Sequence, residues 1–469
     1  MNIVNSTITP TIAGRAQAGA GRAQAGAGGV QASAGGARAG LPWPSRLVVE
    51  TSTRCNLACA MCPKQNGCDD GEGGGDGDFA EELFRALAPA FPRLESLVLN
   101  GIGEPLLHPA LADFVRQARA AMPPDSTIGF QTNGVLMDEA SAMSLIEAGA
   151  DRICVSLDAL DESLYAGIRT GGKLSRTLAA IEALGKARKA TGKDRARIGI
   201  EFVVRRDNLA ELPRVVSWAV KHGVDFMLVS QLFPYEKASV DETAYDANLD
   251  LALELRAKHE ARGAARGLDI TRYPEVYLKY SKTAEDESIV AIVKELQAEA
   301  IGRGITLNLE RLFRHDATWM EGARRVFAEA HSIAGAAGLE LALPEAAPKS
   351  QRACEFVEGG SAFVSRDGKV HPCYFLWHRY ACHVGGWEKL VAPKSFGSLE
   401  ERGILEIWND KAFATFRTNV LRYEYPFCLN CNLALCDYVQ LEDFTQDCHI
   451  NEEPCAACLW CMGLFRCLY

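Results

Sequence analysis

The sequence contains no apolar run long enough to cross a membrane. No segment has about 18 consecutive apolar residues, so we expect no transmembrane helix. Residues 1–12 are polar and mixed, without the basic start and apolar block of a signal peptide. An excess of positive charge is also missing, because the 469 residues carry a net charge of −10. We therefore expect neither nucleic acid nor an anionic membrane surface as a partner.

Cysteine is absent from the middle of the chain and concentrated at two places. Of the 16 cysteines, one group lies near residue 60 and eleven lie from Cys354 onward, while residues 155–353 have none. A secreted disulfide framework is usually small and lacks alternating strands and helices. Clustered thiols on a large α/β chain indicate metal sites in a reducing compartment, so we expect a cytoplasmic protein.

Two segments contain few apolar side chains that could be buried in a core. Residues 13–40 are rich in Ala and Gly and contain AGRAQAG twice in succession, so residues 1–44 are predicted to be a disordered tail. The arginines of this tail could instead contact a partner. The Gly- and Asp-rich residues 66–78 are predicted to be a solvated loop, since they lack the alternating ligands of a calcium loop.

Residues 45–233 alternate between strand and helix patterns. Short apolar runs predict strands at 46–51, 95–100, 126–131, 152–157, 198–204 and 225–231. Helical periodicity predicts helices near 109–121, 138–148, 175–191 and 208–221, with glycine stops at Gly149, Gly192 and Gly223. Asp78-Phe-Ala-Glu81 has the pattern of a capping box for one more helix. Six such β/α units require a parallel sheet.

The middle of the chain, residues 234–350, is predicted to be mostly helical. Helices are expected at 250–260, 288–300 and 321–335, and short strands at 306–309 and 339–343. No motif in this part indicates its role. Residues 351–469 form a third, cysteine-rich part.

Cys55, Cys59 and Cys62 stand at the spacing C-x3-C-x2-C directly after the first predicted strand. Thiolates at such short spacing can turn onto one soft metal centre. Three ligands on a cluster of four irons leave one iron open for chemistry. The alternative is a zinc knuckle, which needs four ligands, and no fourth lies at the usual offset, although Cys68 follows six residues later.

This motif and its position resemble the radical S-adenosylmethionine (radical SAM) superfamily. The resemblance implies a (β/α)6 partial TIM barrel in which the three cysteines hold a [4Fe-4S] cluster and SAM binds the fourth iron. One electron then cleaves SAM to methionine and a 5′-deoxyadenosyl radical, while the protein binds, orients and excludes water. Polar residues follow every predicted strand, as a shared site at the barrel mouth requires.

The resemblance also implies which residues contact SAM. Gly101-Ile-Gly103-Glu104-Pro is similar to the Gly-Gly-Glu-Pro stretch that binds the SAM amino group, where Glu104 could accept from the ammonium. Each of the other residues that could contact SAM could instead have a purely structural role, as a helix cap, a turn residue, a core residue or a surface residue. They are Ser156 and Asp158 for the ribose, Asn133, Met61 near the adenine, and Arg205 for the SAM carboxylate.

The third part resembles the SPASM extension of radical SAM enzymes that modify peptides and proteins. Cys354-x13-Gly368-x4-Cys373 has the shape of its opening pattern, and Cys428-x2-Cys431-x4-Cys436 follows it but departs from the usual continuation. The stretch 451–467 is similar to the end of SPASM proteins thought to mature metalloenzymes, including a group associated with tungsten-dependent oxidoreductases.

The resemblance implies eight auxiliary thiolates, enough for two [4Fe-4S] clusters. They are Cys354, Cys373, Cys428, Cys431, Cys436, Cys455, Cys458 and Cys467. Cys382, Cys448 and Cys461 are left over and could exchange with members of this set, and two zinc sites are the alternative. Cys68 and Cys154 are not expected to be ligands. Tyr374 stands where sulfatase-maturing relatives have an acidic base, which disfavours sulfatase maturation.

The sequence thus predicts a radical SAM/SPASM enzyme that abstracts hydrogen from a peptide or protein substrate, as a maturase of a metalloenzyme. A ferredoxin or flavodoxin would supply electrons. The alternatives are a peptide-crosslinking enzyme and an iron–sulfur electron carrier without SAM chemistry. An electron carrier has no need of the Gly101–Pro105 and Ser156–Asp158 motifs. The substrate and the bond that is changed do not follow from the sequence.

Overall fold

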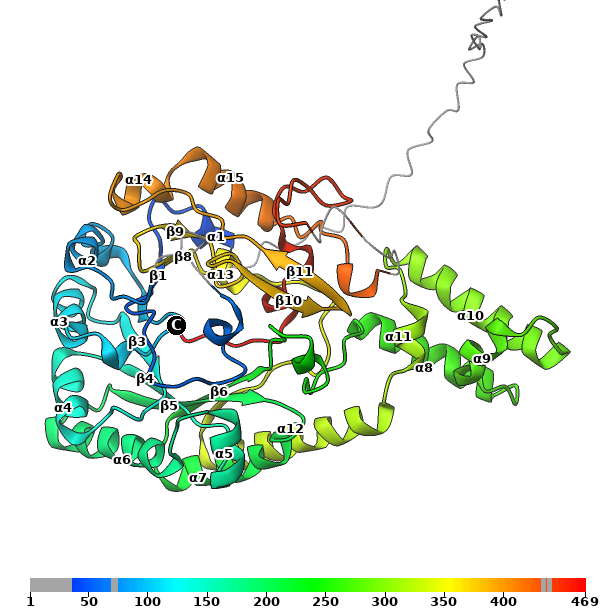
Figure 1. Cartoon of the computed structure of the whole chain (residues 1–469), viewed down its shortest axis with the longest axis horizontal. Coiled ribbons are helices and arrows are strands. Elements are labelled where there is room, and N and C mark those ends of the chain that lie inside the picture. The colour runs from blue at the N-terminus through cyan, green and yellow to red at the C-terminus, as the bar shows by residue number, and fades with distance from the viewer. Residues whose placement is uncertain (1–35, 69–74, 432–435, 437–440) are drawn as a thin grey trace, which may run out of the picture. The chain divides into compact units, whose positions relative to one another are not determined.

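A nine-stranded sheet lies at the centre of the computed structural model, which describes residues 36–68, 75–431, 436 and 441–469 (Figure 1). The strand order is β7-β6-β5-β4-β3-β2-β1-β8-β9. Six strands pair in parallel in chain order, namely β1 (Arg46–Val49), β2 (Ser96–Leu99), β3 (Thr127–Thr132), β4 (Arg152–Ser156), β5 (Arg197–Val204) and β6 (Phe226–Gln231). The six predicted strands and the α/β fold class are confirmed.

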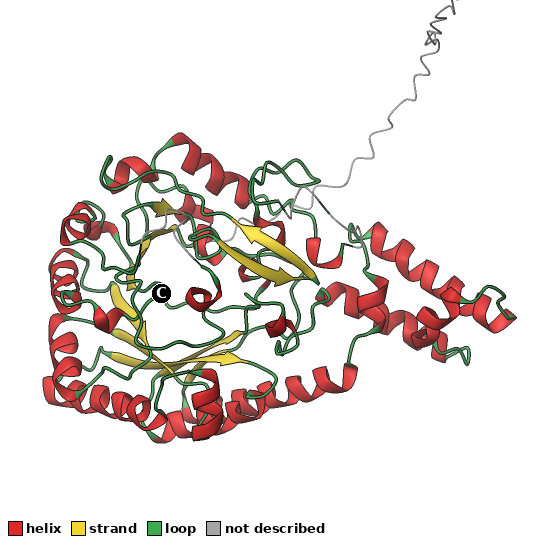
Figure 2. Ribbon diagram, in the orientation of Figure 1, coloured by secondary structure: helices red, strands yellow, loops and turns green. Residues whose placement is uncertain are grey.

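Helices surround the curved sheet on its outer side (Figure 2). They are α2 (Glu81–Ala86), α3 (Leu111–Ala121), α4 (Glu139–Ala148), α5 (Glu162–Ile168), α6 (Leu174–Thr191), α7 (Leu212–Lys221) and α12 (Ala317–Ala337). Strands β2 and β6 are buried along their whole length, as expected for parallel strands covered on both faces. Gly149 and Gly192 end α4 and α6 in the left-handed conformation, which confirms two of the predicted stops.

Two local predictions are wrong. The Asp78–Glu81 pattern is not a capping box, because α2 begins at Glu81 after Ala80. Asp78 instead accepts hydrogen bonds from the Ser52 hydroxyl and the Arg54 guanidinium, so its carboxylate is used by the loop after β1. Residues 306–309 do not form a strand either. Asn308 caps the short helix α11 (Leu309–Phe313), and its side chain accepts from the backbone N–H of Arg311.

Strands from later in the chain extend both edges of the six-stranded core. β7 (Glu340–Ala342) pairs in parallel with β6 and confirms the strand predicted at 339–343. On the other side β8 (Ser361–Val364) pairs in parallel with β1, and β9 (Val370–His371) pairs antiparallel with β8. The predicted boundary at residues 350/351 therefore divides a continuous sheet, and the domain division remains a prediction.

Part of the predicted N-terminal tail is ordered. Residues 1–35 lie outside the described residues, as do residues 69–74 of the predicted loop. Beyond them Gly36–Ala39 forms α1, and the following residues pack against α14 (Ile404–Trp408) and α15 (Lys411–Val420). The Trp408 indole N–H donates to the Leu41 carbonyl at 2.8 Å, and Arg417 donates to the Ala39 carbonyl at 3.1 Å.

The helical middle of the chain contains a small core of its own. Its helices are α8 (Asp250–Ala264), α9 (Tyr273–Leu278), α10 (Ala284–Gly302) and α11, and Figure 1 shows them beside the barrel. Ile270, Val276, Ile289 and Val293 are buried together there. A further hairpin, β10 (Tyr380–Val384) and β11 (Trp387–Val391), follows β9, and α13 (Glu355–Glu358) precedes β8.

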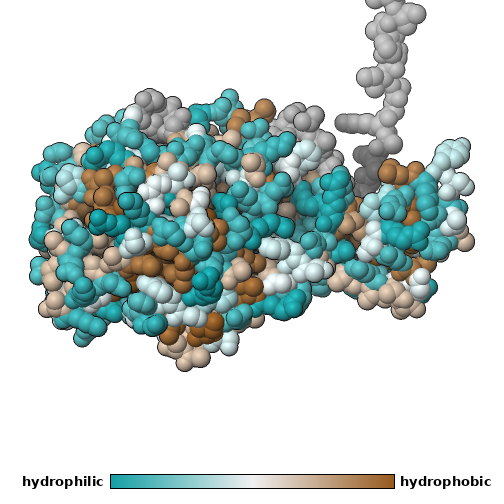
Figure 3. All heavy atoms as spheres, turned by 60° about the horizontal axis from the view of Figure 1, so that its bottom comes forward, coloured by the Kyte–Doolittle hydropathy of each residue, from teal (hydrophilic) through white to brown (hydrophobic). Residues whose placement is uncertain are grey.

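One face of the molecule is largely polar. Figure 3 shows hydrophilic residues over most of one face, with hydrophobic residues in small patches between them. Within the described part of the chain, no helix is both long and apolar enough to span a bilayer.

Trp408→Ala is expected to lower the free energy of unfolding by roughly 3–5 kcal/mol, because the ring is fully buried and the substitution leaves a cavity. It also leaves the Leu41 carbonyl without its donor and removes the ring beneath the Arg417 guanidinium, 3.7 Å from its centroid. Urea denaturation of the metal-free protein measures the change. Leu278→Ala is the matched control, because Leu278 is 83% exposed and its loss should cost no more than about 0.5 kcal/mol. Equal effects of the two substitutions would contradict the packing described.

Candidate functional site

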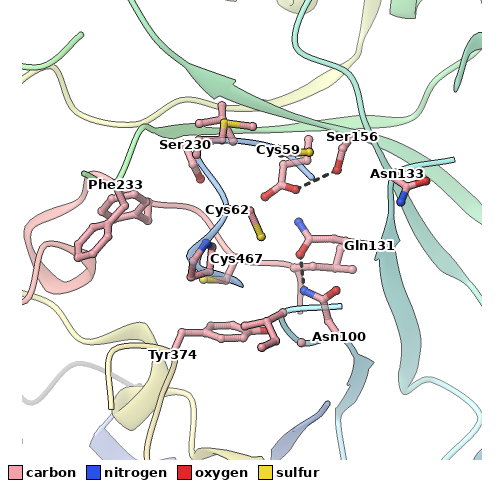
Figure 4. Close-up of a pocket in the computed structure, with 18 of the residues that line it drawn as sticks. Cys59, Cys62, Asn100, Gln131, Asn133, Ser156, Ser230, Phe233, Tyr374 and Cys467 are labelled. Carbon is pink, nitrogen blue, oxygen red and sulfur yellow. Dashed lines mark hydrogen bonds between the residues drawn. The ribbon is translucent and has the colours of Figure 1, made fainter. Parts of the chain in front are cut away.

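A cavity of about 300 Å³ lies where the carboxyl ends of the parallel strands meet (Figure 4). Every strand from β1 to β6 contributes to its wall through the strand end or the loop that follows. Of the residues predicted to hold the first cluster or SAM, the wall contains Cys55, Cys59, Met61, Cys62, Gly101, Gly103, Glu104, Asn133 and Ser156. The structure thus brings together residues that the sequence distributes over the ends of four strands and the loops that follow them.

The three cysteines of the first motif lie on the loop after β1. The backbone N–H of Cys62 donates to the Cys59 carbonyl at 3.0 Å, so the loop turns tightly between them. The Asn66 side-chain amide donates to the carbonyls of Ala60 and Cys62 and holds the end of the turn. Burial raises the pKa of Cys62 to about 11 and also raises that of Cys55, so these thiols are protonated until a metal takes them.

A buried carboxylate supports the glycine loop after β2. Glu50 is fully buried at the end of β1 and accepts from the backbone N–H of Ile102 at 3.1 Å. A Cβ on Gly101 would lie 2.3 Å from the Glu50 Cγ, and a Cβ on Gly103 would lie 2.2 Å from the Ser52 carbonyl oxygen. The glycines are therefore required by the chain beneath the loop, which comes too close for any side chain.

Glu104 joins the loop after β2 to the end of β3. Its carboxylate accepts from the Thr132 hydroxyl at 2.6 Å, the Asn133 N–H at 2.8 Å and the Leu106 N–H at 3.1 Å. Burial raises the pKa of Glu104. A carboxylate offers about four acceptor positions, so three donors leave one for a ligand such as an ammonium group.

Two residues that were predicted to contact SAM are paired with other residues of the protein. Asp158 is fully buried and accepts from Arg169 at 2.5 Å and from the Val203 N–H at 2.8 Å. Arg205 pairs with Asp207 and Glu242. Neither belongs to the described lining of the cavity. Their roles as SAM ligands remain predictions, and Asp158 contributes in the structure by holding Arg169.

Sequence reasoning missed several residues of the wall. Arg169 lies in the wall, where the Asp158 carboxylate keeps its guanidinium charged, and nothing in its local sequence indicates this. Glu201 also lines the cavity and accepts from the Ser156 hydroxyl at 3.4 Å. The sequence feature that could have indicated Glu201 is a charged residue between the apolar Ile200 and Phe202 of β5, which are both buried. Asn100 and Gln131 line the cavity as well, and the Asn100 side-chain amide donates to the Gln131 side-chain oxygen at 2.7 Å.

The later cysteines fall into two further groups. One small cavity is lined by Cys354, Cys373, Cys455, Cys458 and Cys461. A second cavity, of about 380 Å³, includes Cys428, Cys431, Cys436 and Cys448 in its lining. Cys461 and Cys448, left over from the predicted set, thus accompany its members, whereas Cys467 lies in the wall of the main cavity. The predicted auxiliary ligands remain predictions, and the structure separates Cys467 from the others.

A parallel α/β barrel with three cysteines on its first loop is the architecture of enzymes that hold a metal cluster at the barrel mouth. Residues 49–226 match the model of the radical SAM superfamily, and residues 354–432 match that of the SPASM iron–sulfur cluster-binding domain. The tungsten-containing aldehyde ferredoxin oxidoreductase cofactor-modifying protein of Pyrococcus furiosus is 30% identical over 427 residues, which cover 90% of this chain and 96% of that protein. The chain belongs to the radical SAM superfamily and carries a SPASM domain.

Other relatives match smaller parts of the chain. A probable GTP 3′,8-cyclase of Archaeoglobus fulgidus is 34% identical over 140 residues, which cover 29% of this chain and 44% of the relative. Among solved structures, Streptococcus suis SuiB aligns with a TM-score of 0.47 and 14% identity over 81% of this chain and 68% of that chain.

The residues of the main cavity fit the cofactors of this family, a four-iron cluster and SAM. Three soft thiols line one cavity, and Glu104 keeps an acceptor position. Among the described residues, no three His, Cys, Asp or Glu side chains converge closely enough to hold a single metal ion. The thiolates of a cluster bind different iron atoms, so they need not converge in this way.

Gly103→Ala is expected to weaken SAM binding roughly 5- to 150-fold, because the new methyl group must displace the loop and overpacking costs about 1–3 kcal/mol. Gly167→Ala is the control, since a Cβ at Gly167 meets no atom within 4 Å. Equilibrium binding of SAM to the reconstituted proteins compares them. If both variants bound SAM as the unchanged protein does, the close approach of the loop to Ser52 would not matter for the site.

Proposed function

We propose that this protein cleaves SAM and removes a hydrogen atom from a protein-borne substrate during the maturation of a metalloenzyme. The observation that carries the proposal is the single cavity shared by Cys55, Cys59, Cys62, the glycine loop and Glu104. Similarity to a cofactor-modifying protein over 90% of the chain supports maturation as its purpose. The substrate is then the polypeptide of an oxidoreductase or a group bound to it.

The residues of the chain have distinct roles in this proposal. The cluster, once bound by Cys55, Cys59 and Cys62, supplies one electron that splits the sulfonium of SAM and leaves a 5′-deoxyadenosyl radical. Glu104 accepts from the SAM ammonium, and Asn133 and Ser156 contact its polar groups. Four aromatic residues, Phe233, Trp377, Trp460 and Phe465, form an apolar part of the wall and exclude water from the radical.

The two further cysteine groups are proposed to hold auxiliary clusters. Burial raises the pKa of Cys354 and of Cys428 to about 12, so neither is a stable thiolate without a metal. An iron–sulfur cluster that leaves no iron open to a substrate takes four thiolates. The Cys428 group has four members and the Cys354 group has five, which supports two clusters. Such clusters would take an electron from a substrate radical or bind the substrate, and a ferredoxin or flavodoxin would supply electrons to the protein.

Two other functions have less support. Crosslinking of a short peptide would use the same cavity, but the similarity over 90% of the chain is to a cofactor-modifying protein. An electron carrier would need neither a glycine packed closely against the Ser52 backbone, as Gly103 is, nor a carboxylate with an open acceptor position, as Glu104 has. Co-purification with a candidate oxidoreductase, followed by mass analysis of that partner, separates maturation from peptide crosslinking.

Replacing Cys55, Cys59 and Cys62 together by Ala should remove one cluster and abolish SAM cleavage. Iron in the reconstituted protein is expected to fall from about twelve atoms to about eight per chain, since each cluster contributes four. Iron analysis and chromatography of 5′-deoxyadenosine under dithionite give the two readouts. Cys154→Ala is the control, because Cys154 is buried within β4 and should not bind iron. Continued formation of 5′-deoxyadenosine by the triple variant would refute the proposal.

Replacing Cys428 and Cys431 by Ser should remove a different cluster, again about four irons. Replacing Cys455 and Cys458 should remove the third. Each double variant is expected to retain SAM cleavage and to lose product formation, because both groups lie outside the main cavity. Zinc in place of iron at either group, or a full iron content in a double variant, would overturn the auxiliary-cluster assignment.

A further inference from the structure

A fourth thiol reaches the main cavity from the other end of the chain. Cys467 lines this cavity together with Cys62 and Tyr374, and Figure 4 shows the three side chains around the same space. None of the described cavities that collect the Cys354 and Cys428 groups includes it. Cys467 is therefore placed where SAM and substrate would meet, apart from the thiols of the proposed auxiliary clusters.

The backbone on both sides of Cys467 is fixed to the barrel. The Arg466 N–H donates to the Ser230 hydroxyl at 3.0 Å, and that hydroxyl lies 3.2 Å from the Arg466 carbonyl. The Gln231 N–H donates to the Leu464 carbonyl at 3.0 Å. On the far side, the Arg46 guanidinium lies over the Tyr469 ring, 4.4 Å from its centroid. The segment is thus held along the end of β6, and the thiol has a defined position in the wall.

Two polar groups in the same wall have no partner among the described residues. They are the Gln231 side-chain oxygen, on a residue 1% exposed, and the Trp377 indole N–H, on a residue 7% exposed. Buried polar groups nearly always have a hydrogen-bond partner, so an acceptor and a donor left open here point to a ligand in this part of the cavity. Cys467 lines the same cavity as Gln231 and Trp377.

We propose that Cys467 donates its thiol hydrogen atom to carbon radicals formed in this cavity, and in this way completes the reaction on the substrate. The inference rests on the proposed SAM cleavage. Donation of a hydrogen atom from sulfur to carbon is downhill, because an S–H bond is weaker than an alkyl C–H bond. It requires a protonated thiol, the form that a cysteine with an ordinary pKa of about 8.5 has at neutral pH.

The step balances as follows in atoms and electrons. The S–H bond of Cys467 breaks, a C–H bond forms on the substrate radical, and a thiyl radical remains on the sulfur. One electron from a low-potential carrier of the ferredoxin or flavodoxin class and one proton from solvent restore the thiol. Because the substrate radical gains a hydrogen atom, it gives no electron to the proposed auxiliary clusters, which in this reaction bind the substrate. The product keeps the hydrogen count of the substrate but carries one hydrogen that came from solvent, on the face of the carbon that Cys467 can reach.

Abortive SAM cleavage in D₂O tests this without an identified substrate. Reconstituted full-length protein, SAM and dithionite are incubated in D₂O, and the 5′-deoxyadenosine is analysed by mass spectrometry. Because a thiol exchanges with solvent, the wild type should form deuterated 5′-deoxyadenosine. Cys467→Ala and Cys467→Ser should lose the deuterium in whatever 5′-deoxyadenosine they form. Tyr374→Phe, which removes another exchangeable hydrogen of the wall, should keep it.

The outcomes separate the inference from the proposed function. Unlabelled 5′-deoxyadenosine from the wild type, or deuterium that persists in both Cys467 variants or disappears in Tyr374→Phe, would overturn the donor role alone. Absence of 5′-deoxyadenosine from the wild type would refute the proposed function itself.

The iron content of Cys467→Ala is a second readout that does not depend on turnover. It should stay at about twelve atoms per chain, whereas a cluster ligand would cost about four. A loss of four irons would make Cys467 a ligand and end the proposal.

Discussion

The buried carboxylate of Glu50 connects the parts of this protein that must meet for a site to exist. It stands at the end of β1 and accepts from the Ile102 N–H in the glycine loop, from the Arg366 N–H after β8, and from the His378 imidazole at 3.0 Å. A buried charge is costly unless it is paired and hydrogen-bonded, so each of the three donors is held strongly to this point. The cluster loop, the glycine loop and the SPASM region are thereby fixed with respect to one another.

This connection explains why the SPASM region forms part of the wall of the main cavity. β8 continues the barrel sheet beside β1, and the segments that follow bring Tyr374, Trp377 and Cys467 into the main cavity. The barrel alone would leave the cavity open on that side. Radical chemistry needs a site that excludes water, and here the later part of the chain provides that enclosure. Cluster-binding thiols and a cavity wall are thus two contributions of the same region.

Features that depend on neighbouring residues in the chain could be predicted from the sequence. Strands at 46–51 and 225–231 could be located from apolar runs, and Cys55, Cys59 and Cys62 from spacing after the first of them, since such features involve neighbours in the chain. Arg169 and Glu201 were missed because their place in the wall depends on the packing of β4 and β5. The failed capping box has the same origin, because Asp78 is engaged by Arg54 from a distant loop. The grouping of Cys448 and Cys461 with other thiols likewise follows from tertiary contacts.

Because Cys55 and Cys467 lie far apart in the chain, translation separates them in time. At about 5–20 residues per second, the ribosome makes the cluster loop roughly 20–80 seconds before the segment around Cys467. During that interval the glycine loop and the cysteine loop lack the wall formed by Tyr374, Trp377 and Cys467. The side of the cavity that these three residues form is therefore completed only when the last part of the chain has been made and has folded onto the barrel.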